Sequence, residues 1–356
     1  MTEIPESLDT LTPEWLTAAV QGVAPGARAS AVEIVDAHSG TTGRARLAVA
    51  WERGELPSAL FVKLPPTDSL QRAMAVETGM GAREARFCRE LAREVPVRVP
   101  RPIASFWSED RRAYLMLGED LEAAGCTFPS FESGADLAVV RGAVEGLARL
   151  HAAFWESPRF EAGGDLDWIE PPMHHEMGPR LVAAGVEAFG AEQPEAFHEM
   201  APIYTQHGAA VAGVLAAGPQ TLLHGDPHLG NLFLDGGAVG FLDWACVSRG
   251  PGLRDVAYHL CCSVETALRR AEEEKLLRRY LEVLAESGAP APGFDEAFAA
   301  YRRFVAAGWI AGVATYAVGA RMQSLEVGRR AVARANAAIA DLGTPELIRA
   351  ELGLDA

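Results

Sequence analysis

Residues 12–16 predict a short helix, and between residues 31 and 64 short apolar runs alternate with turn-forming residues, a pattern typical of antiparallel strands. Residues 31–35 are strand-like, the small and polar residues 38–43 interrupt them, and residues 46–51 resume an apolar run. A third run, residues 59–64, ends at two consecutive prolines, which cannot continue the hydrogen-bonded ladder of a central strand. We therefore predict three antiparallel strands at the start of the chain.

The hydrophobic period then changes. Between residues 73 and 94, Phe87 and Leu91 recur at helical spacing among many charged residues, which predicts a helix lying against the sheet. Residues 103–107 and 114–117 are again apolar and flank a polar turn, so they predict a hairpin. The first part of the chain should therefore be a small antiparallel sheet with one main helix.

After about residue 122 the pattern is mainly helical, with one interruption by short strands and turns at residues 221–244. The clearest helical runs are residues 137–155, 195–215, 263–287 and 295–340. The pattern predicts an α+β fold with a small sheet-bearing lobe over residues 1–117 and a larger, mostly helical lobe over residues 122–356.

Composition limits the function classes. The formal net charge of −16 opposes binding to nucleic acid or to an anionic membrane, and it is weakly compatible with a cationic substrate. The uncharged, apolar stretch of residues 304–320 is short for a membrane span and predicts a buried helix. The start of the chain lacks the features of a secretory signal, and the five cysteines lack zinc-like spacing. We expect a cytoplasmic protein with free thiols and no obligate protein partner.

The interruption at residues 221–244 carries the candidate chemistry. Residues 223–234 read Leu-His-Gly-Asp-Pro-His-Leu-Gly-Asn-Leu-Phe-Leu, and an apolar hairpin then leads to Asp243. Asp226 and Asn231 must lie on a loop, because the proline and glycine between them disfavour a helix. Phosphoryl transfer needs a carboxylate near the acceptor hydroxyl and oxygen ligands for magnesium, and this segment offers both.

The motif His-Gly-Asp-x-His-x-x-Asn, followed by Leu-Asp-Trp, resembles the hallmark of the aminoglycoside phosphotransferase and choline kinase superfamily. The resemblance implies a bilobal, protein-kinase-like fold that binds ATP and Mg²⁺ between its lobes, with an acceptor pocket in the helical lobe. By this resemblance Asp226 is the catalytic base, and Asn231 and Asp243 are the magnesium ligands. Asp255 would brace the loop, although a helix N-cap is an equally good interpretation from the residues alone.

A kinase-like first lobe should supply a lysine from its third strand, and Lys63 lies there. It is the only charged residue of that strand, so its ammonium group needs an anionic partner or solvent. Glu84, near the middle of the following helix, is the predicted partner, with Glu77 and Glu90 as alternatives. The segments around Lys63 and Glu84 look most like the ecdysteroid-kinase-like branch, and the resemblance runs from about residue 38 to residue 309.

Two further nucleotide contacts follow from the resemblance. The turn at residues 38–43 has two glycines instead of three, and Ser39, Thr41 and Thr42 would supply hydroxyl or backbone N–H donors to phosphate. An ordinary hairpin turn explains this segment equally well. The hinge between the lobes is expected at residues 118–121, with Glu119 and Asp120 as candidates for adenine contacts or, alternatively, as solvated turn residues.

The main residues also have purely structural interpretations. Asp226 could cap a turn, Asn231 could occupy a left-handed position and Asp243 could end a strand, because Asp and Asn favour such places. Their joint occurrence at kinase spacing, after Lys63 and Glu84, favours chemistry. His224 is predicted to brace the loop instead of transferring protons.

Three functions remain open from the sequence. The first is a small-molecule kinase whose acceptor is a hydroxyl of an antibiotic such as an aminoglycoside, or of another alcohol. The second is a nucleotide-binding pseudokinase or regulator. The third, a protein kinase, is disfavoured because only eleven residues separate Asp243 from Asp255 and they contain no Ala-Pro-Glu activation segment.

Overall fold

The computed structural model describes residues 3–40, 42–110, 112–129, 134–172, 177–319 and 324–354. Its internal contacts divide the chain into two compact units. The first comprises Met1–Thr127, Phe233–Gly237 and Phe241–Cys246, and the second comprises Phe128–Leu232, Ala238–Gly240 and Val247–Ala356. The predicted division at residues 117 and 122, with a hinge between, stays a prediction.

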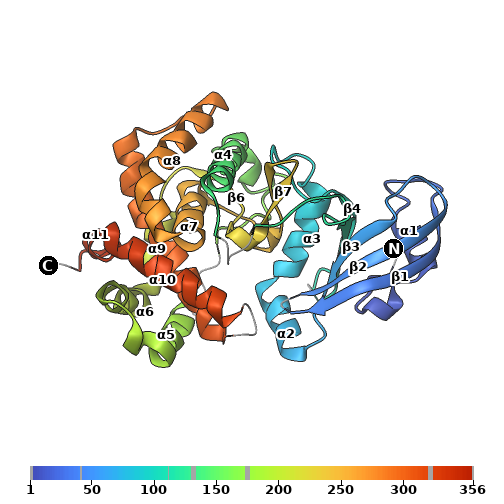
Figure 1. Cartoon of the computed structure of the whole chain (residues 1–356), viewed down its shortest axis with the longest axis horizontal. Coiled ribbons are helices and arrows are strands. Elements are labelled where there is room, and N and C mark those ends of the chain that lie inside the picture. The colour runs from blue at the N-terminus through green and yellow to red at the C-terminus, as the bar shows by residue number, and fades with distance from the viewer. Residues whose placement is uncertain are drawn as a thin grey trace. The chain divides into compact units, whose positions relative to one another are not determined.

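The first unit contains one five-stranded antiparallel sheet in the order β1-β2-β3-β5-β4 (Figure 1). Its strands are β1 (Arg28–Ser39), β2 (Gly43–Arg53), β3 (Ala59–Leu64), β4 (Pro102–Trp107) and β5 (Tyr114–Glu119). Alternate residues of β2 point into the core, where Ala45, Leu47 and Val49 are buried, because successive side chains of a strand face opposite sides of the sheet. The predicted antiparallel sheet is thus confirmed, with a longer first hairpin than the sequence indicated.

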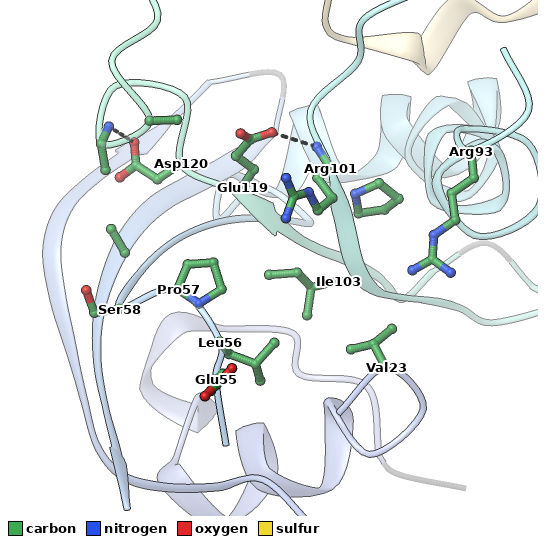
Figure 2. Close-up of a pocket in the computed structure, with 14 residues that line it drawn as sticks. Val23, Glu55, Leu56, Pro57, Ser58, Arg93, Arg101, Ile103, Glu119 and Asp120 are labelled. Atoms are coloured by element: carbon green, nitrogen blue, oxygen red, sulfur yellow. Dashed lines mark hydrogen bonds between the residues drawn. The ribbon is translucent and has the colours of Figure 1, made fainter. Parts of the chain in front are cut away.

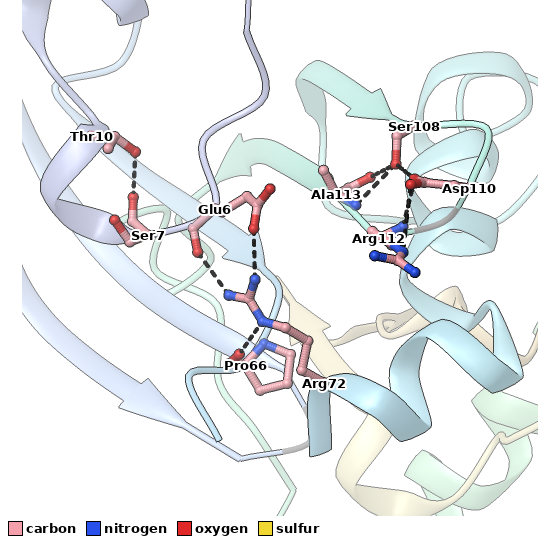
Figure 3. A network of polar contacts seen from close by, with 9 residues as sticks. All are labelled: Glu6, Ser7, Thr10, Pro66, Arg72, Ser108, Asp110, Arg112 and Ala113. Carbon is pink, nitrogen blue, oxygen red and sulfur yellow. Dashed lines mark hydrogen bonds and ion pairs between the residues drawn. The ribbon is translucent and has the colours of Figure 1, made fainter. Parts of the chain in front are cut away.

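Two short elements and a polar network attach the N-terminal segment to the sheet. Helix α1 (Pro13–Ala19) follows the 3₁₀ turn η1 (Leu8–Thr10), and the Thr12 side chain caps α1 by accepting from the Trp15 amide. Arg72, in helix α2 (Ser69–Thr78), donates from Nη1 to Glu6 Oε2 at 2.7 Å and from Nε to the Pro66 carbonyl at 3.2 Å (Figure 3). This arginine therefore joins the N-terminal segment to the chain that follows β3.

The helix predicted over residues 73–94 is two helices. Gly79, with φ of 64°, lies between them as the C-cap of α2 and the N-cap of helix α3 (Met80–Glu90). Glycine adopts this left-handed conformation without the steric cost that a side chain imposes, so the chain turns there. Helix α3 packs on β4 and β5, where Ala85 contacts Tyr114 and Met116 and the Ala85 carbonyl accepts from Ser105 Oγ at 2.6 Å (Figure 1).

The second unit is mainly helical. Its helices are α4 (Leu137–Ala153), α5 (Met177–Phe189), α6 (Glu195–Ala216), α7 (Leu253–Ser263), α8 (Thr266–Glu286), α9 (Phe294–Val318), α10 (Leu325–Asp341) and α11 (Thr344–Leu352), with the short turns η2 (Pro158–Phe160) and η3 (Gly190–Glu192). Helix α9 packs against α5, α7 and α10. The helical run predicted for residues 295–340 is α9 and α10, because α9 ends before Gly319 at a φ of 76° and Ser324 caps α10.

Short strands and 3₁₀ turns interrupt the helices where the sequence predicted them. Strands β6 (Gln220–Leu223) and β9 (Ser248–Pro251) form one antiparallel pair, and β7 (Leu232–Asp235) and β8 (Ala238–Phe241) form another two-stranded sheet. The turns are η4 (Leu229–Asn231) and η5 (Trp244–Cys246). The fold class is therefore confirmed as α+β. Across the part of the chain that the structure describes, no helix is both long and apolar enough to span a membrane.

We expect Gly81→Ala to lower the free energy of unfolding by about 1–3 kcal/mol, because overpacking a core has this order of cost. A Cβ atom at Gly81, inside α3, would lie 2.2 Å from the ring of buried Tyr114. Gly213→Ala is the matched control, since α6 leaves open space there and alanine favours a helix by up to about 1 kcal/mol. Urea unfolding of the three proteins measures both effects. Equal stability of Gly81→Ala and wild type would contradict the packing described here.

Candidate active site

A buried ion pair in the first unit joins β3 to α3. Lys63 Nζ lies 2.8 Å from Glu84 Oε1 and 3.0 Å from Oε2, and both side chains are at most 10% exposed. Nζ also lies 3.3 Å from Asp243 Oδ1. The structure thus brings together the lysine and the glutamate that the sequence singled out, while the alternative Glu90 pairs with Arg86.

Lys63 has two acidic neighbours, Glu84 and Asp243. Burial alone would lower the pKa of Lys63, but the negative charges of Asp243 and Glu84 outweigh burial and raise the pKa above the usual lysine range. The ammonium group therefore stays charged throughout the physiological range. Removing one partner of a buried pair typically costs about 3–5 kcal/mol, since the other charge is left without compensation.

Asp243 reaches this pair through an unusual backbone conformation. Its φ of 63° lies in the left-handed region, which Asp tolerates better than most residues with a side chain. The next residue, Trp244, stacks on Phe87 of α3 with ring centroids 4.2 Å apart and planes 8° from parallel. The stacked rings hold this late segment of the chain against α3, so that Asp243 stays beside Lys63.

The turn between β1 and β2 holds the predicted phosphate-contacting residues. The Ser39 hydroxyl lies 3.1 Å from Thr67 Oγ1, and it also accepts from the Thr67 amide at 3.3 Å. The Thr42 carbonyl accepts from the Gly40 amide at 3.1 Å. Thr41 lies outside the described residues. Phosphate binding by Ser39, Thr41 and Thr42 stays a prediction.

Many polar groups at the end of β5 already form hydrogen bonds with other parts of the chain. Glu119 Oε2 accepts from the Arg101 amide at 3.0 Å (Figure 2). Asp120 accepts from Arg46 Nε at 2.8 Å. The Glu119 amide donates to the Arg101 carbonyl, and the Asp120 carbonyl accepts from the Ala124 amide. An adenine contact from this segment, which stays a prediction, would therefore need other backbone groups.

Glu119 and Asp120 also line a cavity of about 470 Å³ within the first unit (Figure 2). The apolar part of its lining includes Val23, Leu56 and Ile103. The ion pairs of Glu119 with Arg98 and of Asp120 with Arg46 neutralise both acidic groups. These two side chains therefore stabilise the end of the sheet, whatever else the segment binds.

In the second unit, Asp226 lies on the loop between β6 and η4. Its Oδ1 accepts from the Tyr258 hydroxyl at 2.6 Å. Asn231 Nδ2 donates to the Asp226 carbonyl at 2.9 Å and lies 3.3 Å from Asp226 Oδ2. The side chain of Asp226 is 32% exposed, so its carboxylate is oriented by neighbours and still reachable. The structure therefore brings Asp226 and Asn231 into contact, as their spacing predicted.

Asp255, at the start of α7, fixes the backbone of this loop. Its Oδ2 accepts from the His224 amide at 2.7 Å and its Oδ1 from the Gly225 amide at 3.1 Å, and the residue is 1% exposed. The helix N-cap interpretation of Asp255 is wrong, because Gly252 occupies that position. His224 is fully buried, and its Nδ1 accepts from the Asp226 amide at 3.3 Å, which is the bracing role predicted for it.

Four residues of α7 contact the loop in order along it. Besides Asp255 and Tyr258, His259 Nδ1 donates to the Pro227 carbonyl at 2.8 Å, and Ser263 Oγ accepts from the Leu229 amide at 2.9 Å. Tyr258, His259 and Ser263 follow Asp255 by three, four and eight residues, which places all four on one face of the helix. The N-cap interpretation of Asp255 implied a helix in this region, but sequence reasoning did not predict the contact of Tyr258 with Asp226.

The described residues contain no cluster of three or more His, Cys, Asp or Glu side chains that could hold a metal ion. Magnesium commonly uses only one or two protein carboxylates and takes its remaining oxygen ligands from substrate phosphates and water. Asn231 donates through Nδ2, which leaves its carbonyl oxygen for a cation, and the Asp243 side chain is 33% exposed. The donor chemistry of these two residues fits magnesium.

His259 links the stability of the loop to pH. Burial lowers the pKa of His259 to about 4, and its Nε2 has no hydrogen-bond partner among the described residues. Below pH 6.5 the unfolded chain binds a proton at this imidazole while the folded protein does not, so acid favours unfolding. We expect a stability loss of about 2 kcal/mol from this residue between pH 7 and pH 5.

Denaturant unfolding of wild type and His259→Gln gives the free energy of unfolding of each protein at both pH values. The contribution of His259 is the difference between the two proteins in the loss of that free energy from pH 7 to pH 5. The exposed His198 provides the matched control, because His198→Gln should keep the wild-type pH dependence. If His259→Gln and wild type lost the same free energy of unfolding between pH 7 and pH 5, the assignment of a neutral, buried imidazole to His259 would be wrong.

The sequence and the fold were compared with known proteins. The family model "Phosphotransferase enzyme family" matches residues 37–298. A candidate aminoglycoside phosphotransferase from Ralstonia eutropha JMP134 is a similar solved structure, with a TM-score of 0.52 and 15% identity over 93% of this chain and 97% of that one. A second is the amicoumacin kinase hAmiN in complex with AMP-PNP, Ca²⁺ and Ami, with a TM-score of 0.51 and 13% identity over 87% and 88%.

A search of curated proteins found no significant match. The two solved structures share the fold with this chain at low identity. The family match covers well over half of the sequence, including Lys63, Glu84, Asp226, Asn231 and Asp243. The chain therefore belongs to the phosphotransferase enzyme family.

Proposed function

We propose that this phosphotransferase moves the γ-phosphate of ATP to a hydroxyl group of a small molecule, with Asp226 as the catalytic base. The observation that carries the proposal is the Asp226 carboxylate, which is oriented by Tyr258 and Asn231 on a loop that Asp255 braces. A carboxylate held in this way can orient an acceptor hydroxyl and accept its proton. Little other covalent chemistry is required of the protein, because phosphoryl transfer depends mainly on positioning and charge.

The buried pair in the first unit supports a nucleotide-binding role. A lysine that is kept charged by Glu84 is suited to bind phosphate oxygens, because its ammonium group has donors to share. Asn231 and Asp243 would hold Mg²⁺, which neutralises charge on the phosphates when it is bound. The structurally similar amicoumacin kinase was solved with AMP-PNP and Ca²⁺, which supports the binding of a nucleotide and a divalent cation by this chain.

The other possibilities are less well supported. A pseudokinase would be expected to lack part of the catalytic set, whereas Lys63, Glu84, Asp226, Asn231 and Asp243 are all present. The short connection between Asp243 and Asp255 disfavours a protein kinase. The similarity to the ecdysteroid-kinase-like branch stays a prediction, and so does the lack of an obligate protein partner. The five cysteines are free, which supports a cytoplasmic location.

Replacing Asp226 by Ala should abolish acceptor-dependent ADP release, with a loss of at least about 100-fold, because general base catalysis contributes this much or more. ADP would be measured with ATP, Mg²⁺ and a panel of hydroxylated compounds. The exposed Asp295 supplies the control, since Asp295→Ala should keep full activity. Nucleotide binding should survive in Asp226→Ala. Full turnover by this variant would refute the proposed base, and binding without turnover in wild type across the panel would favour the pseudokinase.

Replacing Lys63 by Met should weaken ATP binding and lower kcat, because Glu84 and Asp243 would then repel the nucleotide phosphates. The chain contains one other lysine, Lys275, which is exposed and pairs with Glu272, so Lys275→Met is the matched control. Titration with ATP and Mg²⁺, together with kcat at saturating ATP, measures both effects. Unchanged ATP affinity and unchanged kcat in Lys63→Met would argue against the nucleotide role.

A further inference from the structure

Arg254 is the second residue of α7 and carries a charge that the described structure compensates only in part. Its guanidinium group makes no hydrogen bond or ion pair with any residue that the structure describes, and its Nη1 atom is sealed from solvent without a partner. The residue as a whole is only partly buried. An arginine in this state is rare, because buried charges are normally paired.

The neighbouring groups compensate the charge of Arg254 only in part. The adjacent carboxylate of Asp255 already accepts from the His224 and Gly225 amides. The other close group is Tyr204, and burial raises the pKa of its phenol, which therefore stays protonated and uncharged. Consistent with this, burial lowers the pKa of Arg254 to about 10, and Asp255 and Tyr204 only partly oppose the effect.

The position of Arg254 relates this charge to the candidate base. Arg254 and Tyr258 are four residues apart on α7, so their side chains leave the same face of the helix with Cβ atoms about 6 Å apart. The Tyr258 hydroxyl contacts Asp226 Oδ1 at 2.6 Å. Arg254 therefore lies one helical turn from the side chain that touches the residue expected to receive the acceptor hydroxyl.

We propose that Arg254 binds an oxyanion of the acceptor, so that the substrate is a hydroxyl compound carrying a carboxylate or a phosphate group. This inference rests on the proposed function. A guanidinium group offers parallel N–H donors that match both kinds of oxyanion. The transferred phosphate is the other possible source of an oxyanion. The acceptor is favoured because Lys63, the candidate ligand of the nucleotide phosphates, belongs to the first unit, whereas Arg254 and Asp226 belong to the second.

This inference changes the expectation drawn from net charge. The overall charge of −16 is compatible with a cationic substrate, but net charge describes the whole surface and not one site. A buried, unpaired guanidinium acts locally and repels a cationic group placed next to it. The acceptor predicted here is therefore an anionic alcohol, such as a hydroxy acid or a sugar phosphate, instead of an aminoglycoside or choline.

The first test needs no turnover. Thermal unfolding of the nucleotide-free protein would be followed with increasing inorganic phosphate or acetate, against chloride at equal ionic strength. Ligands that bind only the folded state raise Tm in a dose-dependent way. We expect a saturable rise with the oxyanions in wild type and in Lys63→Met, and the loss of most of this rise in Arg254→Met. An equal rise in Arg254→Met and wild type would overturn the proposal.

A folding defect would not mimic this result. Arg254→Met removes an unpaired buried charge, so its Tm without added oxyanion should equal or exceed that of wild type. Arg254→Lys keeps the charge and loses the forked donors, so it should show an intermediate rise. Arg141→Met is the surface control, because Arg141 is exposed and pairs only with Glu145 on its own helix. A lower Tm of Arg254→Met without oxyanion, together with a normal oxyanion response, would assign Arg254 a purely structural role.

The second test compares matched acceptors in the ADP-release assay: glycerate with glyceramide, and glycerol 3-phosphate with glycerol. We expect wild type to prefer the charged member of at least one pair. Arg254→Met should raise KM for that acceptor roughly tenfold or more, since a charge-assisted hydrogen bond is lost. KM for ATP and the slow reaction with the neutral member should not change.

Other outcomes separate the sources of the oxyanion. If kcat fell equally for charged and neutral acceptors, Arg254 would act on the transferred phosphate, and the acceptor proposal would be overturned. A preference for neutral or cationic acceptors that Arg254→Met leaves unchanged would also overturn it. If wild type phosphorylated none of the four compounds, either the chosen acceptors or the proposed function would be wrong. The thermal test would then still decide whether Arg254 binds an oxyanion.

Discussion

The carboxylate of Asp255, almost completely removed from water, accepts two backbone amides of the loop that carries Asp226. A buried carboxylate is costly unless hydrogen bonds compensate it, and here the compensation comes from the loop itself. The loop therefore cannot move away from α7 without leaving a buried charge unsatisfied. Tyr258, His259 and Ser263 continue the attachment along the same helix face, so a single helix sets the path of the whole loop.

In the first unit, a buried charge is compensated by side chains instead of backbone amides. Lys63 is compensated by Glu84 and Asp243, which come from α3 and from a segment far along the sequence. Asp243 reaches its place only through a left-handed backbone conformation, and the stacking of Trp244 on Phe87 stabilises that segment. Both units thus anchor candidate catalytic groups by satisfying buried charges. Arg254 is the exception, since its guanidinium group has no hydrogen bond or ion pair with the described residues.

Much of this arrangement could be predicted from the sequence, and the reason differs between its parts. Strand β3 was predicted with the bounds that the structure has, because two prolines end it and a lysine interrupts an apolar run. Asp226 and Asn231 were found because the motif spacing is short and specific. The pairing of Lys63 with Glu84 could be predicted because a lone buried charge demands a partner, and the kinase pattern named which one.

Other parts depend on information that the sequence pattern lacks. The break at Gly79 was missed because a glycine inside a helical pattern is often tolerated, and only its φ reveals the turn. Leu253, Val256, Ala257 and Leu260 follow the apolar spacing of a helix, but that spacing does not reveal that the polar residues of α7 face the loop. The position of Tyr258 beside Asp226 therefore could not be derived. The hydrogen bonds that already occupy Glu119 and Asp120 depend on tertiary contacts with Arg101 and Arg46.

The first unit is assembled from three separate stretches of the chain, and this has a consequence for its synthesis. When the ribosome has released residues up to Thr127, all five strands of the sheet are available, but Asp243 and Trp244 do not yet exist. Until they emerge, the face of Phe87 that Trp244 covers stays bare, and Lys63 has Glu84 as its single acidic neighbour. More than a hundred further residues, most of them belonging to the other unit, must therefore be synthesised before Asp243 can join Lys63 and Glu84.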